Sequence, residues 1–153
     1  MPAGMGRWWW GLLLLLSACS EVIVKTQLLV FTIDAQANLN HPIAVDLVLI
    51  YDEQLLGEMV KLSAHDWFIK RAQLKRDYPI SLATWEWEFV PEQPSQHILS
   101  FKMPPERKEA KAALVFANYL TPGSHRVRID AMSSIRIHLQ EQQWVVEPLG
   151  TPT

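Results

Sequence analysis

The only cysteine of this chain, Cys19, directly follows a short and strongly apolar segment. Arg7 precedes the run WWWGLLLLL, and Ser17 and Ala18 stand immediately before the cysteine. A positive residue, an apolar stretch and a cleavage site of small residues together define a secretory signal peptide. A membrane-spanning helix needs about 20 apolar residues, and this run has about half that length. We therefore expect residues 1–18 to be a signal peptide, so that the fold begins after them.

The four residues that end this segment resemble the bacterial lipobox. Leu16 is aliphatic, Ser17 and Ala18 are small, and Cys19 stands where the lipidated cysteine would be. The resemblance implies cleavage before Cys19 and attachment of acyl chains to it, with about 0.8 kcal/mol of membrane binding for each buried methylene. Ser20, rather than an aspartate, follows the cysteine, which favours the outer membrane. The predicted location is the periplasmic face of the cell outer membrane, through a lipid anchor.

The remaining chain has the length of one ordinary domain, which we assign to residues 19–149, with 150–153 as a loose tail. Acylation of Cys19 would leave no free thiol, so disulfides, thiolate metal sites and cysteine catalysis are excluded. The formal net charge of the whole chain is −2. Nucleic-acid binding requires many cationic contacts to phosphates, so this charge disfavours it.

Most of the chain has the pattern of short β-strands. The segment TWEWEFV alternates strictly, with Trp85, Trp87 and Phe89 on one face and Glu86 and Glu88 on the other, as in a half-buried strand. We expect the aromatic face to lie in the core, and the alternative is an exposed platform for a ligand. Strands are predicted at 22–33, 43–51, 84–90, 96–103, 113–120, 125–130, 134–140 and 144–146. Strands at this spacing predict a mainly β fold, an antiparallel β-sandwich.

A helical insertion interrupts the strands at about residues 53–78. Apolar residues recur at three-to-four spacing between Leu55 and Leu62, which indicates a helix. Ser63 and Asp66 have the spacing of a capping box, and a second helix should run from Ala64 until Pro79 stops it. The basic residues of this helix are predicted to lie opposite its apolar stripe: Lys70, Arg71, Lys75 and Arg76.

The side chains that could carry chemistry do not form a recognisable site. The five histidines of the chain are His41, His65, His97, His125 and His138. No two of them have the close spacing of metal ligands, so we predict no metal site. No glycine-rich phosphate loop and no nucleophile elbow are present. Glu86 and Glu88 are interpreted as a solvated face rather than as catalytic carboxylates. The interpretation is of a protein that is not an enzyme and has no cofactor.

Three arginines at alternating positions, Arg126, Arg128 and Arg136, are expected on neighbouring strands. They predict an outward basic patch. Such a patch could pair with Glu86 and Glu88, or it could bind an acidic partner.

Taken in order, three segments resemble the outer-membrane lipoprotein family of the type VI secretion membrane complex, the TssJ/SciN-like proteins. They are NLNHPIAVDLVLIY from Asn38 to Tyr51, the aromatic pair Trp67-Phe68, and ALVFANYL followed by HRVRI. The resemblance implies a transthyretin-like β-sandwich with an added helical element. It also implies a structural tether in the outer membrane that binds the periplasmic part of an inner-membrane partner. The chain departs from the family in a shorter loop around Asn38 and in the basic residues after the aromatic pair.

Two loops are candidates for partner binding, Gln36–His41 and Thr121–Ser124, because a rigid sandwich usually carries its function on loops. The resemblance implies that loops between strands dock the partner. We expect Asn38, Asn40 and His41 to be exposed and to form this contact. Two alternatives remain open: a pilotin that escorts a secretin to the outer membrane, and a ligand-binding lipoprotein in which Trp85 and Trp87 line a pocket.

The lipid anchor gives the first testable prediction. Cys19→Ser should abolish acylation, because the serine hydroxyl cannot replace the thiol that receives the lipid. Labelling of cells with radioactive palmitate measures this, and the variant should appear as precursor or as soluble protein. Equal incorporation of label into the variant and the parent chain would disprove the lipobox interpretation.

Overall fold

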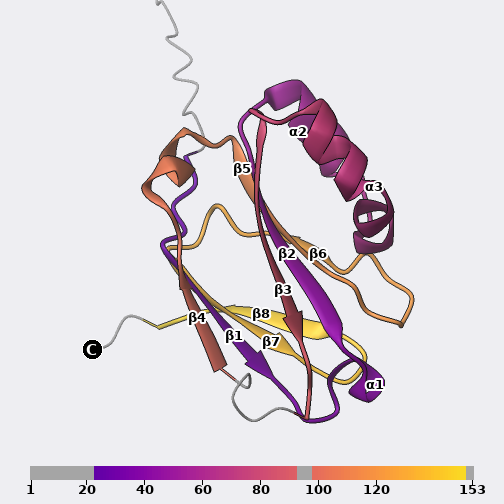
Figure 1. Cartoon of the computed structure of the whole chain (residues 1–153). Helices are drawn as coiled ribbons and strands as arrows, with labels where there is room; N and C mark the ends of the chain where they lie inside the picture. Colours follow the sequence, from indigo (N-terminus) through magenta and orange to yellow (C-terminus); the bar gives the residue numbers. More distant parts are fainter. Residues whose placement is uncertain (1–22, 93–97, 151–153) are drawn as a thin grey trace, which may run out of the picture.

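The computed structural model describes residues 23–92 and 98–150, which form two four-stranded sheets packed face to face (Figure 1). Sheet 1 has the order β4 (Ile98–Lys102), β1 (Leu28–Ile33), β7 (Ser134–Leu139) and β8 (Trp144–Pro148). Sheet 2 has the order β3 (Leu82–Phe89), β2 (Ile43–Ile50), β5 (Ala112–Ala117) and β6 (Arg126–Arg128). The predicted mainly β sandwich is confirmed.

One strand pair differs from the predicted antiparallel arrangement. β1 pairs in parallel with β7, with Leu28 opposite Ser134 and Ile33 opposite Leu139. The other strand pairs of the described residues are antiparallel, so sheet 1 is mixed. The alternation of side chains along a strand specifies which residues face inward. It does not specify the direction of a neighbouring strand that lies about a hundred residues away in the sequence.

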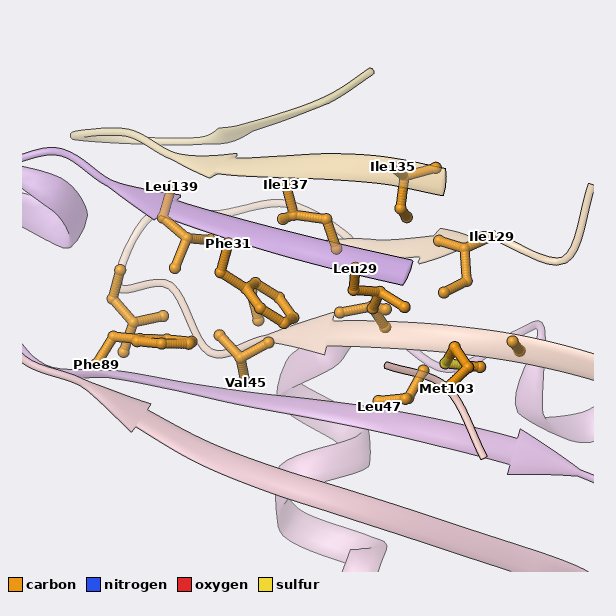
Figure 2. Close-up of a cluster of buried hydrophobic side chains, with 14 of the residues drawn as sticks. Leu29, Phe31, Val45, Leu47, Phe89, Met103, Ile129, Ile135, Ile137 and Leu139 are labelled. Carbon is orange, nitrogen blue, oxygen red and sulfur yellow. The ribbon is translucent and has the colours of Figure 1, made fainter. Parts of the chain in front are cut away.

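The core lies between the sheets and is built from the alternating inward residues of their strands (Figure 2). Leu29 and Phe31 of β1 and Ile137 of β7 point from sheet 1 toward Val45 and Leu47 of β2. All five side chains are fully buried. Apolar burial contributes about 25 cal/mol per Å² removed from water, so this cluster is the main source of stability in a domain without disulfides.

The aromatic residues of β3 face this core, as predicted, but only Phe89 is fully buried. Trp85 and Trp87 are half-buried, because β3 is an edge strand of sheet 2. The Trp87 ring lies 5.2 Å from Phe31 and 5.1 Å from Phe101, centroid to centroid. The two tryptophans therefore close the open side of the sandwich.

The helical insertion is confirmed and covers the outer face of sheet 2. It consists of α2 (Glu53–Met59) and α3 (Ala64–Asp77). The predicted capping box is present, since Ser63 Oγ accepts from the backbone N–H of Asp66 at 3.1 Å and Asp66 Oδ2 accepts from that of Ser63 at 3.4 Å. A second buried cluster fills the space between the helices and the sheet, and its largest member, Trp67, stacks on Phe116 with ring centroids 5.1 Å apart.

A buried carboxylate, Asp46 of β2, lies beneath α3. It accepts hydrogen bonds from Trp67 Nε1 at 2.8 Å and from Arg71 Nη1 at 2.9 Å. The prediction that Arg71 lies on the outward face of α3 is therefore wrong, because this side chain turns back to pair with Asp46. Burial raises the pKa of Asp46 above its usual value, although the hydrogen bonds from Arg71 and Trp67 oppose the rise.

The predicted basic patch is also wrong. Arg126 and Arg128 lie on β6 of sheet 2, whereas Arg136 lies on β7 of sheet 1. Arg126 donates to the backbone carbonyls of Val60 and Leu62, which ties β6 to the end of α2. Arg128 pairs with Asp130 at 2.7 Å and Arg136 with Glu147 at 3.0 Å.

The carboxylate of Glu86, one of the two partners considered for these arginines, binds α3 instead. It pairs with Lys75 and, at 3.5 Å, with Arg71. The hydrogen bond from Lys75 lowers the pKa of Glu86. Glu88 is exposed, in agreement with the interpretation of a solvated face.

Several predictions fall on other parts of the chain. The signal peptide at 1–18, Cys19, His97 and residues 151–153 lie outside the described residues. The segment between β4 and β5 contains a short 3-10 helix, η2 (Pro105–Glu109). No helix in the described part of the chain has both the length and the apolarity to cross a membrane.

Asp46→Ala should lower the free energy of unfolding by about 2–3 kcal/mol, because it leaves the buried Trp67 N–H and the Arg71 guanidinium without their acceptor. Glu86→Ala is the matched control. It removes an exposed partner of the same arginine and should cost less than about 1 kcal/mol. Chemical denaturation measures both values. Equal losses in the two variants would contradict the role given to the buried carboxylate.

The same pair of variants should show opposite pH dependences. The folded state binds the Asp46 proton more tightly than the unfolded state does, so stability due to this group falls as the pH rises from 3.8 through its raised pKa. The folded state binds the Glu86 proton less tightly, so stability due to Glu86 rises as the pH increases toward 4.5. Denaturation curves across this acidic range should therefore show the cost of Asp46→Ala shrinking and that of Glu86→Ala growing with pH.

Candidate functional site

Three loops meet at the end of the sandwich where β1, β5 and β7 finish (Figure 1). They are the β1–β2 connection at residues 34–42, the β5–β6 loop at 118–125 and the β7–β8 loop at 140–143. We call these residues the loop cluster. It contains both loops that were predicted to bind a partner, and it adds a third that the sequence did not indicate.

The turn labelled α1 (Ala37–Asn40) has an unusual backbone. Asn38, Leu39 and Asn40 have φ angles of 50°, 55° and 60°, so they form a left-handed turn rather than a right-handed helix. This conformation costs roughly 1–2 kcal/mol per residue for ordinary side chains, and among residues other than glycine it is tolerated best by asparagine and aspartate. The cost for Leu39 must be offset by contacts around the turn.

The contacts that hold this turn come from the β7–β8 loop. The backbone N–H of Asn38 donates to Gln140 O at 3.1 Å, and that of Leu39 donates to Glu141 O at 3.0 Å. Two consecutive left-handed residues can direct both amides to one side, which an extended chain cannot do. The turn is therefore fixed to its neighbour by its backbone as well as by its side chains.

The prediction that Asn38 is exposed is wrong, because its side chain is 1% exposed. Its Nδ2 donates to Pro42 O at 3.0 Å, and its Oδ1 accepts from the backbone N–H of Leu120 at 2.7 Å. A side-chain amide carries both donors and an acceptor, so one residue can satisfy two loops. Asn38 therefore braces the loop cluster from inside and is not available to a partner.

Tyr119 makes a second brace. Its hydroxyl donates to Gln143 O at 2.8 Å and accepts from the backbone N–H of Gln140 at 3.1 Å. Burial raises the pKa of this phenol, so it remains neutral at physiological pH. The His125 ring stacks on Tyr119 at 4.8 Å, and Thr121 Oγ1 donates to Gln142 O at 2.6 Å. The hydrogen bonds of Tyr119 and Thr121 join the β5–β6 and β7–β8 loops, whereas the His125 ring packs within the β5–β6 loop.

The two other predicted partner-binding residues lie at the surface. Asn40 is exposed, and its Nδ2 donates to Glu92 Oε1 at 2.8 Å. His41 is also exposed, and its Nδ1 lies 2.9 Å from Leu39 O. Both can reach a partner without unfolding the turn, and their role as contacts stays a prediction.

The loop cluster also presents apolar side chains that sequence reasoning missed. Leu39 is 42% exposed and Leu120 is 60% exposed. Residues 34–42, 118–125 and 140–143 contain no lysine or arginine, whereas Asp34 and Glu141 are acidic. The sequence did contain a signal for the exposure of Leu39. This leucine stands between two asparagines, in a segment whose composition is typical of an exposed turn.

Among the described residues, two cavities lie beside the loop cluster, one small and one open to solvent. A cavity of about 240 Å³ lies between the start of α3 and the β5–β6 loop, with His65 and His125 in its lining. A shallower hollow of about 540 Å³ is lined by Thr121, Pro122 and residues 140–143. Ligand sites are usually apolar clefts of roughly 300–1,000 Å³. Within residues 23–92 and 98–150, no group of three or more histidine, cysteine, aspartate or glutamate side chains could hold a metal ion.

Comparison with known proteins places this fold in a defined structural class. No protein-family model matches the chain, and no curated protein matches its sequence. Solved structures do match. The T6SS lipoprotein TssJ1 from Pseudomonas aeruginosa superimposes with a TM-score of 0.60 at 13% identity, over 84% of this chain and 99% of that one. The chain thus has the β-sandwich fold of a type VI secretion lipoprotein.

Two further structures support this assignment. Serratia marcescens Lip, described as a membrane-bound component of the type VI secretion system, matches with a TM-score of 0.56 at 16% identity, over 78% of this chain and 95% of that one. A chain in the structure of the T6SS protein TssM C-terminal domain from EAEC matches with a TM-score of 0.55 at 13% identity, over 80% of this chain and 100% of that one. None of the three descriptions names an enzyme. The resemblance to TssJ-like proteins found in the sequence is confirmed at the level of the fold.

Asn38→Ala should destabilise the protein by about 2–3 kcal/mol, because it orphans the buried Leu120 N–H and removes the residue type that best tolerates the left-handed turn. Asn40→Ala is the matched control from the same turn. Asn40 has the same left-handed backbone, so both variants carry that penalty, and Asn40→Ala should cost about 1–2 kcal/mol less because it leaves no buried group without a partner. Thermal or chemical denaturation of both variants makes the comparison. A neutral Asn38→Ala would show that the loop cluster does not depend on this brace.

Proposed function

We propose that this protein is a lipid-anchored component of a type VI secretion membrane complex, attached to the periplasmic face of the outer membrane through acylated Cys19. In this role it is a structural tether that binds the periplasmic part of an inner-membrane partner. The observation that carries the proposal is the braced loop cluster with its left-handed turn, on a sandwich that has the fold of TssJ1 and Lip. The match to a chain in a TssM C-terminal domain structure motivates a TssM-type protein as the partner.

The loop cluster has the properties of a preorganised docking surface. Its three loops are joined by the Asn38 and Tyr119 side chains, so binding needs little further ordering. Leu39 and Leu120 are apolar side chains that can enter pockets on a partner, and such buried anchors dominate interface energies. Strained backbone tends to occur where a surface must hold one shape for recognition.

The charge of the cluster indicates the chemistry of the partner surface. Asp34, Glu92 and Glu141 lie at or beside the cluster, and its three loop segments carry no lysine or arginine. Complementary charge steers encounter and selects partners more than it adds affinity. The partner should therefore present apolar pockets for the leucines and a basic rim around them.

The ligand-binding alternative receives less support. It requires Trp85 and Trp87 to line an accessible pocket, yet both rings pack against Phe101, at 5.8 Å and 5.1 Å. They complete the core at the edge of sheet 2. No specific contact favours the pilotin alternative over the tether.

Leu39→Asp and Leu120→Asp should each weaken capture of the partner about tenfold or more, since the loss of a central anchor typically exceeds 1.4 kcal/mol. Aspartate tolerates the left-handed conformation at position 39, so the fold should be retained. Affinity purification from gently solubilised envelopes measures capture, and a secretion assay measures its consequence. Ile69→Asp is the matched control, because Ile69 is a 67% exposed apolar residue on α3, away from the cluster.

Asn40 and His41 belong in the same experiment as a double alanine variant, with Asn38 left intact because it is buried. Its partner capture should fall while the fold is retained, with a stability loss of no more than the roughly 1–2 kcal/mol that alanine costs at the left-handed position 40. If the leucine variants and this double variant are folded, reach the outer membrane and still support full capture and secretion, the loop cluster is not the docking surface.

A further inference from the structure

The fold begins immediately after the position of the predicted anchor. Val24 is 1% exposed and Thr26 is fully buried. The backbone N–H of Lys25 donates to Asp130 O at 2.8 Å, and the hydroxyl of Thr26 lies 2.7 Å from Met132 O. Residues from Val24 onward are therefore fixed against the turn that precedes β7.

Five residue steps separate Cys19 from Val24. They span at most about 18 Å when fully extended. A globular domain of this size has a radius of gyration of about 14 Å, and thus a diameter of roughly 36 Å. A tether shorter than the diameter cannot let the domain turn over. A tether of this length, about equal to the radius, lets the domain tilt but keeps the far end of the sandwich away from a bilayer that holds Cys19.

The near end includes residues 23–27, η2, the turn at 130–133 and the β2–α2 connection, and Figure 1 shows it on the opposite side of the sandwich from α1. Ile23 is an apolar residue that is 49% exposed there. Met103, just before η2, donates its backbone N–H to Gln27 O at 2.8 Å, so η2 lies beside the entering chain. We call this set of residues the anchor-end surface.

The anchor-end surface and the adjacent strand β4 carry lysines that are not neutralised by an ion pair among the described residues. They are Lys25, Lys102 and Lys108, and each is exposed. Arg107 bonds Pro104 O at 3.1 Å, while its buried Nε has no partner in the described part of the chain. Lysine or arginine near an anionic bilayer contributes about 1 kcal/mol each. Glu106 and Glu109, with Asp52 and Glu53 after β2, reduce the local charge, so the lipid supplies most of the attachment and the lysines favour one orientation.

We propose that the anchor-end surface lies on the bilayer, with Ile23 and the lysines at the level of the phospholipid headgroups. The proposal rests on the lipid anchor of the proposed function. It fixes how the domain is presented: β1 runs away from the membrane, and the loop cluster points into the periplasm. The domain is then a rigid extension of the membrane surface rather than a particle that tumbles on a flexible linker.

The test uses the full lipoprotein, purified from membranes and reconstituted in phosphatidylethanolamine vesicles that contain phosphatidylglycerol. Lys108→Cys places a thiol-reactive fluorophore on the anchor-end surface. Gln142→Cys is the matched control, an exposed position in the loop cluster. The measurement is quenching of each fluorophore by a lipid with a spin label on its headgroup. Lys108→Cys should be quenched several-fold more strongly than Gln142→Cys.

The outcomes separate this inference from the function on which it rests. Failure of the protein to float with the vesicles would show that Cys19 is not lipidated, and would overturn both proposals. Flotation with equal quenching at the two positions, or with stronger quenching at Gln142→Cys, would overturn the membrane-facing orientation alone. Circular dichroism of both labelled proteins checks that the fold is intact, and a labelled Lys25→Cys variant gives a second position that must follow Lys108→Cys.

Discussion

The hydrogen-bonded carboxylate of Asp46 is the interaction on which the layered architecture depends. β2 and β5 are buried on both faces, between the sandwich core and the helical layer, so sheet 2 requires α2 and α3 to cover it. Apolar packing alone would let a helix slide over such a surface. Asp46 prevents this, because Trp67 and Arg71 must both reach one buried acceptor, one helical turn apart along α3. Burial of the Asp46 carboxylate costs desolvation free energy, which is why its pKa is raised. In return, the two hydrogen bonds hold α3 at a single position on the sheet.

The same logic operates at the loop end of the sandwich. Asn38 is a buried polar residue whose amide links two loops, as Asp46 links a strand and a helix. Tyr119 adds the third loop, and the left-handed turn is held in place by its neighbours instead of by its own propensity. Leu39 is therefore displayed by a backbone that would not adopt this shape alone. The polar residues that look most suited to binding a partner divide into one that builds the surface, Asn38, and two that lie on it, Asn40 and His41.

Local patterns predicted the elements well, and long-range pairing explains the errors. Alternation placed Trp85, Trp87 and Phe89 on the inner face of β3, and Ser63 with Asp66 marked the start of α3, because both signals are carried by neighbouring residues. Arg71 and Asn38 were assigned to the surface because each is polar in a local pattern, while their partners lie 25 and 82 positions away. Arg136 was grouped with Arg126 because strand spacing does not reveal which sheet a strand joins. The parallel pairing of β1 with β7 was hidden for the same reason.

The position of β1 connects the anchor with the loop cluster. β1 follows the entering chain directly, continues into the left-handed turn, and lies between β4 and β7 in sheet 1. A load between a lipidated Cys19 and a partner held at the loop cluster would run along this strand. Because β1 is hydrogen-bonded on both sides, the load would shear two ladders at once rather than open them bond by bond. A strand at the edge of the sheet, paired on one side only, could not resist in this way. The burial of Leu29, Phe31 and Ile33 beneath it adds the core to the same resistance. In the proposed function, β1 is thus the strand that joins the anchor-end surface to the loop cluster, and its pairing on both sides suits it to carry a load between them.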